Sequence, residues 1–515
     1  MIKQEAMLSS WVLYVLEQSS RFFAEHGQSA YLVGGSIRNL LLQQPCVDWD
    51  IALAGDIRLL ARQLANRLGG FYAPMHEKAC RVIVKQEPYE VAIDLSPLQG
   101  STIAEDVATR DFTINAIAAP LGAVVDLLMT RASLEGIADL AIDPLHGIAD
   151  LATRTLRVTS ETALQKDPLR LLRAMRFTLQ YQLKIEPATA RLIRQEAHLL
   201  PQVAAERIHD ELYALLRSDG ACERLRFLDT YGLLTIIIPE LEPARGMQQP
   251  SLHHWDVFEH SLETVTMLEK LARLLQQTPA ELAQADLEVG GQGDMLALQQ
   301  LLQEAEEQRI FSFARLTSPE MKLAALLHDI GKTTTHAVDE EGNITFYHHP
   351  QAGVPLVQQI TRRLKISTHE SRAIQQVAAH HMRPGQLSHS TITPRAIRRF
   401  FVDLGPTGIY VALASLADHL SMRGPDPLTV HWQRHRGAVR ILLTRYIRER
   451  QQILPPRLIQ AEELMRRFNL TPGPFIGQLL ESIAEAQAEG ILHSKEEVLW
   501  FVEEKLQRIQ PDSEK

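Results

Sequence analysis

Apolar and polar positions along the first 150 residues predict short strands separated by helices. Strand-like apolar pieces occur near residues 30–33, 48–53, 80–85 and 90–95, and a helical leucine pattern covers 57–68 between them. Residues 11–25 carry a further amphipathic pattern, which His26-Gly27 ends. The first 150 residues are therefore expected to form a mixed α/β domain.

After about residue 150 the apolar spacing is that of helices almost throughout. Successive helices are expected over 161–218, a histidine-rich helical block over 253–420, a basic helix over 431–450 and final helices over 458–508. The stretch 276–309, rich in Gln, Ala and Glu and broken by glycines, predicts an inserted helical hairpin or a mobile excursion. The whole chain is expected to be an α+β protein with one small mixed sheet at the front.

Composition limits the cellular compartment and the kinds of partner that can be expected for this protein. The 515 residues have a net charge of −9, so any nucleic-acid binding must come from local basic surface. The cysteines Cys46, Cys80 and Cys222 lie far apart and form no metal-binding spacing, which suits a reducing cytosol. No apolar run reaches the ~18 residues of a membrane span, and the N-terminus lacks a signal-peptide pattern. We expect a cytoplasmic protein with no membrane partner, and the sequence leaves its oligomeric state open.

A glycine turn and two aspartates carry the clearest candidate chemistry. Gly34-Gly35 follow a short strand, a helix begins at Ser36, and Asp48 and Asp50 lie on the next strand. Such a turn lets backbone N–H groups approach a phosphate at the positive end of a helix. Residues two apart on a strand face the same side, so both carboxylates can hold Mg²⁺ for phosphoryl or nucleotidyl transfer. The alternative is a solvated strand edge.

Two further segments extend this candidate site. Asp94, on another strand-like piece, could complete a carboxylate triad. In the segment RDFTINA, Arg110 could hold a triphosphate and Asn115 a ribose, although an ordinary helix cap with a surface Arg–Asp pair is the alternative. The segment from Asp143 to Leu151 predicts a structural turn.

Asp167 begins a segment with two interpretations. With Pro168 after it, Asp167 occupies the position of a helix N-cap. Alternatively, Asp167 could accept from the exocyclic amine of C or A while Arg170 donates to ring or carbonyl acceptors of the same base. The protein could then select CTP or ATP without a nucleic-acid template.

The order of these motifs resembles that of the class II tRNA nucleotidyltransferases (CCA-adding enzymes) and the related bacterial poly(A) polymerases. The matching segments are LVGGSIRNLLL…DWD, RDFTINAIA, DPLHGIADL, KDPLRLLRAMRF and ERIHDEL. The resemblance implies a polymerase β-like nucleotidyltransferase head at 1–150, a helical neck at 151–245 and a helical tRNA-binding region at 426–515. It implies that Asp48 and Asp50 bind metal. Within these motifs we assign the nucleotide site to Gly34, Gly35, Arg38, Arg110, Asp111, Asn115, Asp167, Arg170, Arg173 and Arg176.

Three positions depart from the family's usual pattern. Asn39 stands where the family usually has Asp, Thr109 where it has Arg, and Lys166 where it has Glu. Asn39 removes a carboxylate, and Lys166 reverses a charge beside the proposed base-recognition pair. None of the three removes a residue that we assign to metal or base binding. They would instead affect which nucleotide the protein prefers.

A second set of residues matches the order of the HD phosphohydrolase superfamily over 250–425. It consists of His260, His328 and Asp329 in HDIGK, His349, His381 and Asp418. Imidazole and carboxylate groups suit a divalent transition metal, although a lone helical histidine is usually structural. The resemblance implies phosphomonoesterase or 2′,3′-cyclic phosphodiesterase chemistry by a metal-activated water.

Together these features predict an enzyme that adds C and A from CTP and ATP to the 3′ end of tRNA and releases pyrophosphate. The alternatives are an A-adding or CC-adding enzyme, a poly(A) polymerase, an HD phosphohydrolase with an RNA-binding head, and a non-catalytic RNA-binding protein. Seven arginines between 434 and 457, with Arg395, Arg398 and Arg399, predict either a phosphate-binding face or a solvated amphipathic helix.

Overall fold

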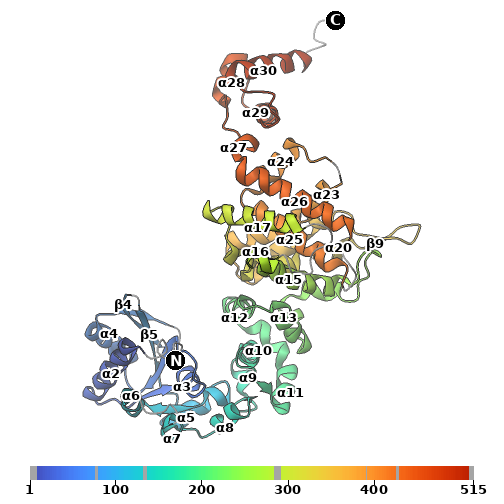
Figure 1. Ribbon diagram of the computed structural model, residues 1–515. Coiled ribbons are helices and arrows are strands. Elements are labelled where there is room, and N and C mark those ends of the chain that lie inside the picture. The colour runs from blue at the N-terminus through green and yellow to red at the C-terminus, as the bar shows by residue number, and fades with distance from the viewer. Residues whose placement is uncertain are drawn as a thin grey trace. The chain divides into compact units, whose positions relative to one another are not determined.

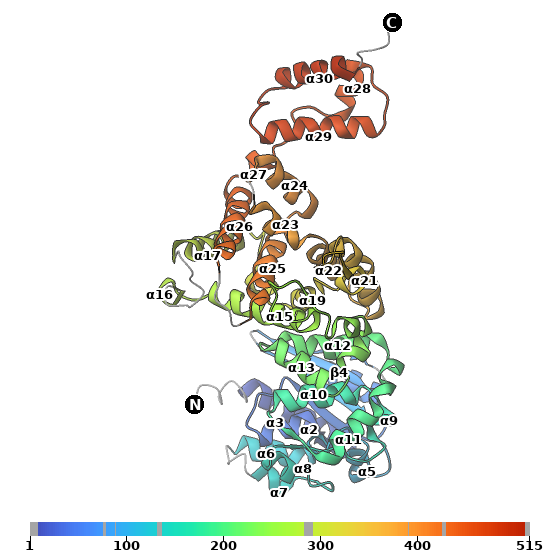
Figure 2. The ribbon, with the colours of Figure 1, turned by 90° about the vertical axis from the view of Figure 1, so that its right-hand side faces the viewer.

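The computed structural model describes residues 9–75, 79–87, 89–130, 136–282, 292–389, 391–424 and 429–509 (Figures 1 and 2). The chain divides into two compact units: Met1–Glu211 with Thr230–Ile236, and Leu212–Asp229 with Ile237–Lys515. The first unit contains a six-stranded sheet, and the described part of the second is almost entirely helical. The expected α+β class is confirmed.

The sheet has the strand order β3-β4-β5-β2-β1-β6. Its strands are β1 (Ala30–Val33), β2 (Asp48–Leu53), β3 (Phe71–Pro74), β4 (Cys80–Gln86), β5 (Tyr89–Pro97) and β6 (Ala118–Pro120). Only β2 and β5 pair in parallel, and the other neighbours are antiparallel. The edge strands β3 and β6 were not predicted, because each is very short and ends in a proline, which weakens a strand pattern.

Helices cover this sheet. They are α2 (Ser10–Glu25), α3 (Gly35–Leu41), α4 (Ile57–Leu68), α5 (Ile103–Ala108), α6 (Leu121–Met129), α7 (Gly136–Leu140) and α8 (Gly147–Ala152). The helix α2 contacts α4, α6 and the sheet, and its neighbours α4 and α6 contact the sheet as well. Side chains fix the helix starts, since Ser9 caps α2 and Asp56 caps α4. Asp143 accepts from the backbone N–H groups of Gly147 and Ile148 at the start of α8, in agreement with a structural turn.

The rest of the first unit, and the junction with the second, is built from short elements. They are η2 (Thr113–Asn115), β7 (Thr155–Leu156), α9 (Ala163–Lys166), α10 (Arg170–Gln180), β8 (Lys184–Ile185), α11 (Pro187–Glu196), η3 (Ala197–Gln202), α12 (Ala205–Arg217), α13 (Ala221–Thr230), α14 (Leu234–Ile237) and η4 (Pro239–Ala244). The predicted start of α10 at Pro168 is wrong by two residues. Asp167 instead accepts from the backbone N–H of Leu169 at 3.2 Å, in a turn that precedes the helix.

The second unit continues with α15 (Val257–Leu274), α16 (Pro279–Leu282), α17 (Gln292–Glu307), α18 (Phe313–Leu316), α19 (Pro319–Leu327), α20 (Lys332–Thr335), β9 (Ala337–Val338), β10 (Ile344–Thr345), α21 (His349–Arg363), α22 (Thr368–His380), α23 (Met382–Leu387), α24 (Pro394–Leu404), α25 (Thr407–Met422), α26 (Val430–Arg448) and α27 (Arg450–Ile453). The helix α15 packs against α19 and α25, and α22 packs against α19 and α21. Within the predicted insert 276–309, α16 and α17 are described, and 283–291 lie outside the described residues.

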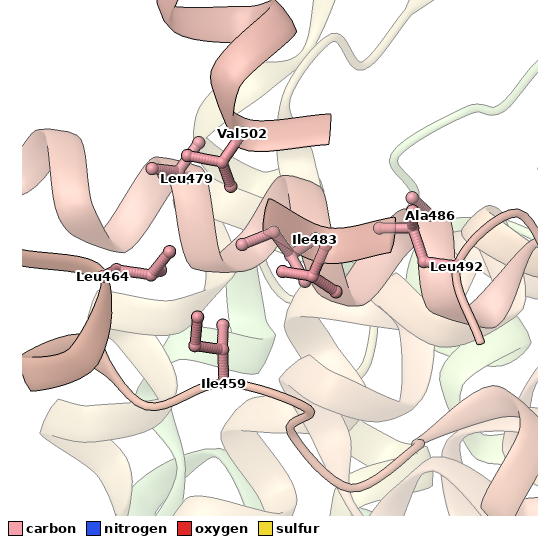
Figure 3. Packing of buried hydrophobic residues seen from close by; sticks show 8 residues of the cluster. Ile459, Leu464, Leu479, Ile483, Ala486, Leu492 and Val502 are labelled. Atoms are coloured by element: carbon pink, nitrogen blue, oxygen red, sulfur yellow. The ribbon is translucent and has the colours of Figure 1, made fainter. Parts of the chain in front are cut away.

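Three helices follow: α28 (Ala461–Phe468), α29 (Pro474–Ala488) and α30 (Lys495–Ile509). They enclose a small apolar cluster to which each helix contributes, with Leu464, Leu479 and Val502 among its members (Figure 3). The chain leaves α28 through Asn469 in a left-handed conformation, which ends the helix. The expectation of a pair or trio of helices over 458–508 agrees with this arrangement.

Within the described residues, no single helix has the length and apolar character to cross a membrane. The helices α24 and α25 meet these criteria only when taken together, and they are bent by 106° with respect to each other.

Candidate functional site

A cavity of about 610 Å³ opens in the first unit beside the Gly34-Gly35 turn and β2. Twelve of the residues that the sequence predicted for metal and nucleotide line it: Gly34, Gly35, Arg38, Asp48, Asp50, Arg110, Asp111, Asn115, Asp167, Arg170, Arg173 and Arg176. Asp94 is not among the lining residues. The structure thus gathers segments from residue 34 to residue 176 around one cavity.

The turn requires glycine for steric reasons. Gly34 has a φ of +60°, which L side chains rarely adopt, and a Cβ there would lie 2.8 Å from Nη1 of Arg110. A Cβ on Gly35 would lie 3.3 Å from Oδ2 of Asp50. The side chain of Ser36 then ties the turn to β2, because its hydroxyl accepts from the Asp50 N–H at 2.7 Å and donates to the Asp48 carbonyl at 3.3 Å. The backbone is consequently open to the cavity on the side of the carboxylates.

Asp50 lies in an acidic environment. In the parallel β2–β5 register, Asp50 is paired with Asp94, and Asp48 lies on the same face two residues earlier. Burial of the Asp50 carboxyl, with the negative charges of Asp94 and Asp48 beside it, raises its pKa to about 6. Carboxylate oxygens that repel each other in this way suit a hard divalent cation such as Mg²⁺, so the donor set fits a metal at Asp48 and Asp50.

Asp94 has a different partner. Its two oxygens accept from Nε and Nη2 of Arg81, each at 2.7 Å, and the same guanidinium reaches Oδ2 of Asp48 at 3.1 Å. Arg81 is therefore the cation next to the predicted triad. Arg81 could not be predicted from the sequence, because nothing in the order of residues on β4 indicates which side chains of β2 and β5 it meets.

The arginines around the cavity fall into two groups. Arg110 pairs with Asp106 at 3.0 Å, Arg173 with Asp111 at 2.7 Å and Arg176 with Glu211 at 2.7 Å. Among the described residues, Arg38 and Arg170 have no carboxylate within ion-pair distance. The guanidinium groups of Arg38 and Arg170 therefore have no direct carboxylate partner, although the charges of Asp111, and of Asp50 or Asp167 respectively, act on them from a distance.

Asp111 and Asn115 organise the cavity wall. Burial raises the pKa of Asp111, but the charge of Arg173 and hydrogen bonds from Asn115, Arg173 and the Phe112 N–H outweigh it, so its pKa lies below the ordinary value. The Asn115 amide donates to Asp111 at 2.9 Å, while its oxygen accepts from Arg38. Both side chains thus contact other protein groups as well as the cavity.

Both members of the proposed base-recognition pair line the cavity and are bonded to other protein groups. Arg170 donates to the carbonyl oxygens of Thr109, Arg110 and Ala163 at 2.9–3.2 Å. Asp167 accepts from Arg207 at 2.8 and 3.1 Å. Arg207 lies in the ERIHDEL motif and also lines the cavity, but the sequence assigned it no role. Its place in the ERIHDEL motif was the feature of the sequence that could have indicated a role for Arg207.

The second unit contains another cluster, which brings together all six residues predicted for the HD site. His260 Nε2 lies 3.1 Å from Asp418 and 3.4 Å from Asp329. His328 Nε2 lies 3.3 Å from Asp329 and 3.5 Å from Asp418. On the other side of Asp329, His349 and His381 place their Nε2 atoms 3.1 and 3.3 Å from Oδ1.

The imidazoles of this cluster direct their Nε2 atoms toward its carboxylates, and Nε2 of His349 also lies 3.4 Å from Nε2 of His381. The Nδ1 atoms of His328, His349 and His381 donate to backbone carbonyls at 2.8–3.0 Å, which fixes the tautomer. His260 Nε2, His328 Nε2 and Asp329 Oδ1 are buried and have no hydrogen-bond partner. Unsatisfied buried ligand atoms of this kind fit a bound divalent metal, and the geometry offers two overlapping groups, His260-His328-Asp418 and His328-Asp329-His381.

The carboxylates of this cluster are ionised. Burial raises the pKa of Asp329, but the neighbouring His328 and Lys332 outweigh that effect and hold the pKa well below its ordinary value. Lys332 lies 2.5 Å from Asp329 and also donates to Gln249 at 2.6 Å. The cluster therefore presents charged carboxylates next to imidazole nitrogens, and both are ligand types that suit a divalent transition metal.

The basic helix α26 is engaged within the protein. Arg436 is buried, Arg440 lies 3.0 Å from Asp294, and Arg448 lies 2.6 Å from Glu304. Both acids belong to α17, which is part of the predicted insert. Arg436, Arg440, Arg445 and Arg448 thus have intramolecular acidic partners, which argues against a free phosphate-binding face on this helix.

Comparison with known protein families agrees with this organisation. Residues 30–157 match the poly A polymerase head domain, residues 182–245 match a probable RNA and SrmB-binding site of polymerase A, and residues 257–423 match the HD domain.

Curated relatives cover nearly the whole chain. The A-adding tRNA nucleotidyltransferase of Deinococcus radiodurans is 33% identical over 484 residues, which is 92% of this chain and 95% of that protein. The CC-adding tRNA nucleotidyltransferase of Thermus thermophilus is 30% identical over 92% of this chain and 93% of its own. The multifunctional CCA protein of Nitrosococcus oceani is 27% identical over 69% of this chain and 77% of its own.

Solved structures share the fold. A CCA-adding enzyme in an apo form has a TM-score of 0.61 at 19% identity, with 99% of this chain and 97% of that chain covered. The Thermotoga maritima CCA-adding enzyme complexed with tRNA has a TM-score of 0.57 at 20% identity, with 98% of each chain covered. The fold and the cavity define a nucleotidyltransferase. More specifically, the chain belongs to the class II tRNA nucleotidyltransferase and poly(A) polymerase family, and it carries an HD domain.

Proposed function

We propose that this protein is a tRNA nucleotidyltransferase that adds part of the CCA end, either the two cytidines from CTP or the terminal adenosine from ATP. The observation that carries the proposal is the extent of similarity. An A-adding and a CC-adding enzyme match 92% of this chain at 30–33% identity, whereas the multifunctional CCA protein matches 69% at 27%. This favours the narrower alternative over complete CCA addition.

In this proposal the cavity of the first unit holds the nucleoside triphosphate. Asp48 and Asp50 would hold Mg²⁺, which supplies positive charge against the attacking hydroxyl and the leaving pyrophosphate. The 3′ oxygen of tRNA attacks the α-phosphorus, the bond from that phosphorus to the bridging oxygen breaks, and pyrophosphate leaves. Arg38 and Arg110 bind the phosphates next to the Gly34-Gly35 turn.

Base selection belongs to Asp167 and Arg170 on the opposite wall. Arg170 keeps part of its guanidinium for the base while its bonds to three carbonyls fix its position. Asp167 is available to a base amine once Arg207 releases one of its oxygens.

The test uses tRNAs that end at the discriminator base, at C and at CC, each incubated with CTP, with ATP and with both. A CC-adding enzyme extends the first two substrates to CC and stops, even when ATP is present. An A-adding enzyme extends only the CC-ended tRNA, by one nucleotide from ATP.

Complete CCA synthesis on the discriminator-ended tRNA would overturn the proposal of partial addition. Repeated adenosine addition to any of the three tRNAs would instead identify a poly(A) polymerase. The absence of incorporation on every substrate, with the HD domain still hydrolytic, would overturn the nucleotidyltransferase proposal as a whole.

The HD cluster favours a second activity of the same chain. We propose hydrolysis of phosphomonoesters or 2′,3′-cyclic phosphates by a water on a divalent transition metal held by His260, His328, Asp329 and Asp418. Metal-treated protein should hydrolyse 2′,3′-cyclic AMP or p-nitrophenyl phosphate, and His328→Ala should abolish this activity. A metal-loaded wild-type protein that hydrolyses neither compound would contradict the proposal.

A further inference from the structure

Arg38 is a buried cation whose direct partners are neutral. Its side chain is 5% exposed. It donates to the amide oxygens of Asn115 and Asn39 and, at 2.6 Å, to the hydroxyl of Tyr181. Among the described residues no carboxylate lies within ion-pair distance of it. Burial disfavours the charged guanidinium, and the carboxylates of Asp111 and Asp50, whose charges act on it, lie beyond ion-pair distance. Arg38 therefore presents a positive potential to the cavity.

Tyr181 makes two kinds of contact with this guanidinium. Its ring centroid lies 4.3 Å from Cζ of Arg38, and Phe177 one helical turn earlier lies 5.2 Å away. Its hydroxyl accepts from Arg38 and from Gln180 and donates to Asn39 at 3.3 Å. Tyr181 thus stacks against the guanidinium and also bonds to its edge, and it is itself 3% exposed.

The arrangement has a consequence for ligand binding. A carboxylate in the place of Tyr181 would hold Arg38 equally well but would cancel its charge. A phenol fixes the guanidinium and leaves that charge for an anion in the cavity. Arg170, which also lacks a carboxylate at ion-pair distance, is likewise held by neutral acceptors, the three carbonyl oxygens.

We propose that Tyr181 is a positioning residue that holds Arg38 for the β- and γ-phosphates of the incoming nucleotide. Tyr181 thereby gives the cavity its preference for nucleoside triphosphates over monophosphates. The inference deepens the proposed function and rests on it, because it assumes that CTP or ATP occupies this cavity. Tyr181 does not touch the reacting atoms, and it acts through Arg38.

The test is binding of CTP, ATP, CMP and AMP to the full chain by calorimetry with Mg²⁺ and without tRNA, so that no turnover occurs. Tyr181→Phe keeps the ring and loses the hydroxyl, and should weaken binding of the preferred triphosphate about 5-fold. Tyr181→Leu loses both and should weaken it about 30-fold. Binding of the corresponding monophosphate should stay the same in both variants.

The matched control is Tyr231→Phe. Tyr231 also carries an arginine over its ring, since Cζ of Arg194 lies 4.5 Å from the centroid, but Tyr231 does not line the cavity. Tyr231→Phe should bind all four nucleotides as the wild type does. In the Arg38→Met background, Tyr181→Phe should have no further effect on triphosphate affinity, because the residue acts through Arg38.

Three results would overturn the inference. One is unchanged triphosphate affinity of Tyr181→Phe, and another is an equal loss for mono- and triphosphates, which would indicate a structural role. The third is an undiminished effect of Tyr181→Phe in the Arg38→Met background. A wild-type protein that binds neither CTP nor ATP would overturn the proposed function itself, and the inference with it.

Discussion

The buried Asp50 carboxylate can hold a cation, but its negative charge lowers the free energy of unfolding of the protein. In the metal-free protein its pKa of about 6 lies above the ordinary 3.8, because the carboxyl is buried beside Asp94 and Asp48. Between about pH 4 and pH 6 the folded protein binds a proton that the unfolded chain releases. The free energy of unfolding therefore falls as pH rises through this window, by up to about 3 kcal/mol.

Asp50→Asn should remove this penalty. In EDTA at pH 8 the variant should unfold at a higher temperature than the wild type, with a gain of about 1–3 kcal/mol, and the gain should vanish near pH 4. The measurement is thermal unfolding across pH in both proteins. Asp126→Asn, an exposed change on α6 outside the cavity, is the matched control and should show no such pH dependence. A gain that is equal at pH 4 and pH 8 would contradict the assignment.

Asp94 and Arg81 should behave as one pair. Because both Asp94 oxygens bond to Arg81, Asp94→Asn and Arg81→Met should lower nucleotide incorporation by similar factors, and the double variant should lose little more than either. Single-turnover incorporation in the four proteins measures this coupling. Full additivity of the two losses would show that Asp94 acts independently of Arg81, as a direct metal ligand would.

Among individual residues, those of the cavity that lie in recognisable motifs could be predicted from the sequence. The spacing of Gly34-Gly35 from Asp48 and Asp50 was sufficient to place both carboxylates at one cavity. Arg81 and Tyr181 could not be predicted in the same way. Arg81 meets Asp94 through the pairing of β4 with β5, and Tyr181, at the end of α10, meets Arg38, which is far away in the sequence. Neither Arg81 nor Tyr181 belongs to a motif with a known spacing.

Among the elements, α26 and α17 bear on an alternative that the sequence leaves open. The arginines of α26 predict either a phosphate-binding face or a solvated amphipathic helix, and α17, from the biased 276–309 segment, supplies acids to Arg440 and Arg448. Sequence alone could not reveal this pairing, because the two helices are separated by more than 100 residues. In contrast, the strands β1, β2, β4 and β5 and the helices α2, α4 and α26 lie close to the ranges predicted from apolar periodicity.

The pairing leads to a prediction for RNA binding. Arg440→Gln and Arg448→Gln should leave the salt dependence of tRNA affinity unchanged and lower the stability by less than about 1 kcal/mol each. The measurement is the slope of log K against log salt for each variant. A decrease in slope of about 0.9 per substitution would instead show that these arginines contact phosphates.

For the whole molecule, the two candidate sites lie in different compact units. We expect their activities to be separable. His328→Ala should abolish phosphohydrolysis and keep nucleotide incorporation, because the carboxylates of the first unit are unchanged. Incorporation and hydrolysis of 2′,3′-cyclic AMP are measured on the same preparation. Loss of both activities in a correctly folded His328→Ala protein would contradict two independent sites.

The most direct test of the central claim is incorporation of a radiolabelled nucleotide into tRNAs ending at the discriminator base, C and CC. Wild type, Asp48→Ala, Asp50→Ala and the control Asp126→Asn are compared at equal folded concentration. We expect the wild type and the control to extend at least one of the three tRNAs. Asp48→Ala and Asp50→Ala should each lose activity by about 1,000-fold or more, since each removes a ligand of the charge-stabilising cation. Incorporation by Asp48→Ala or Asp50→Ala at the wild-type rate would contradict the account.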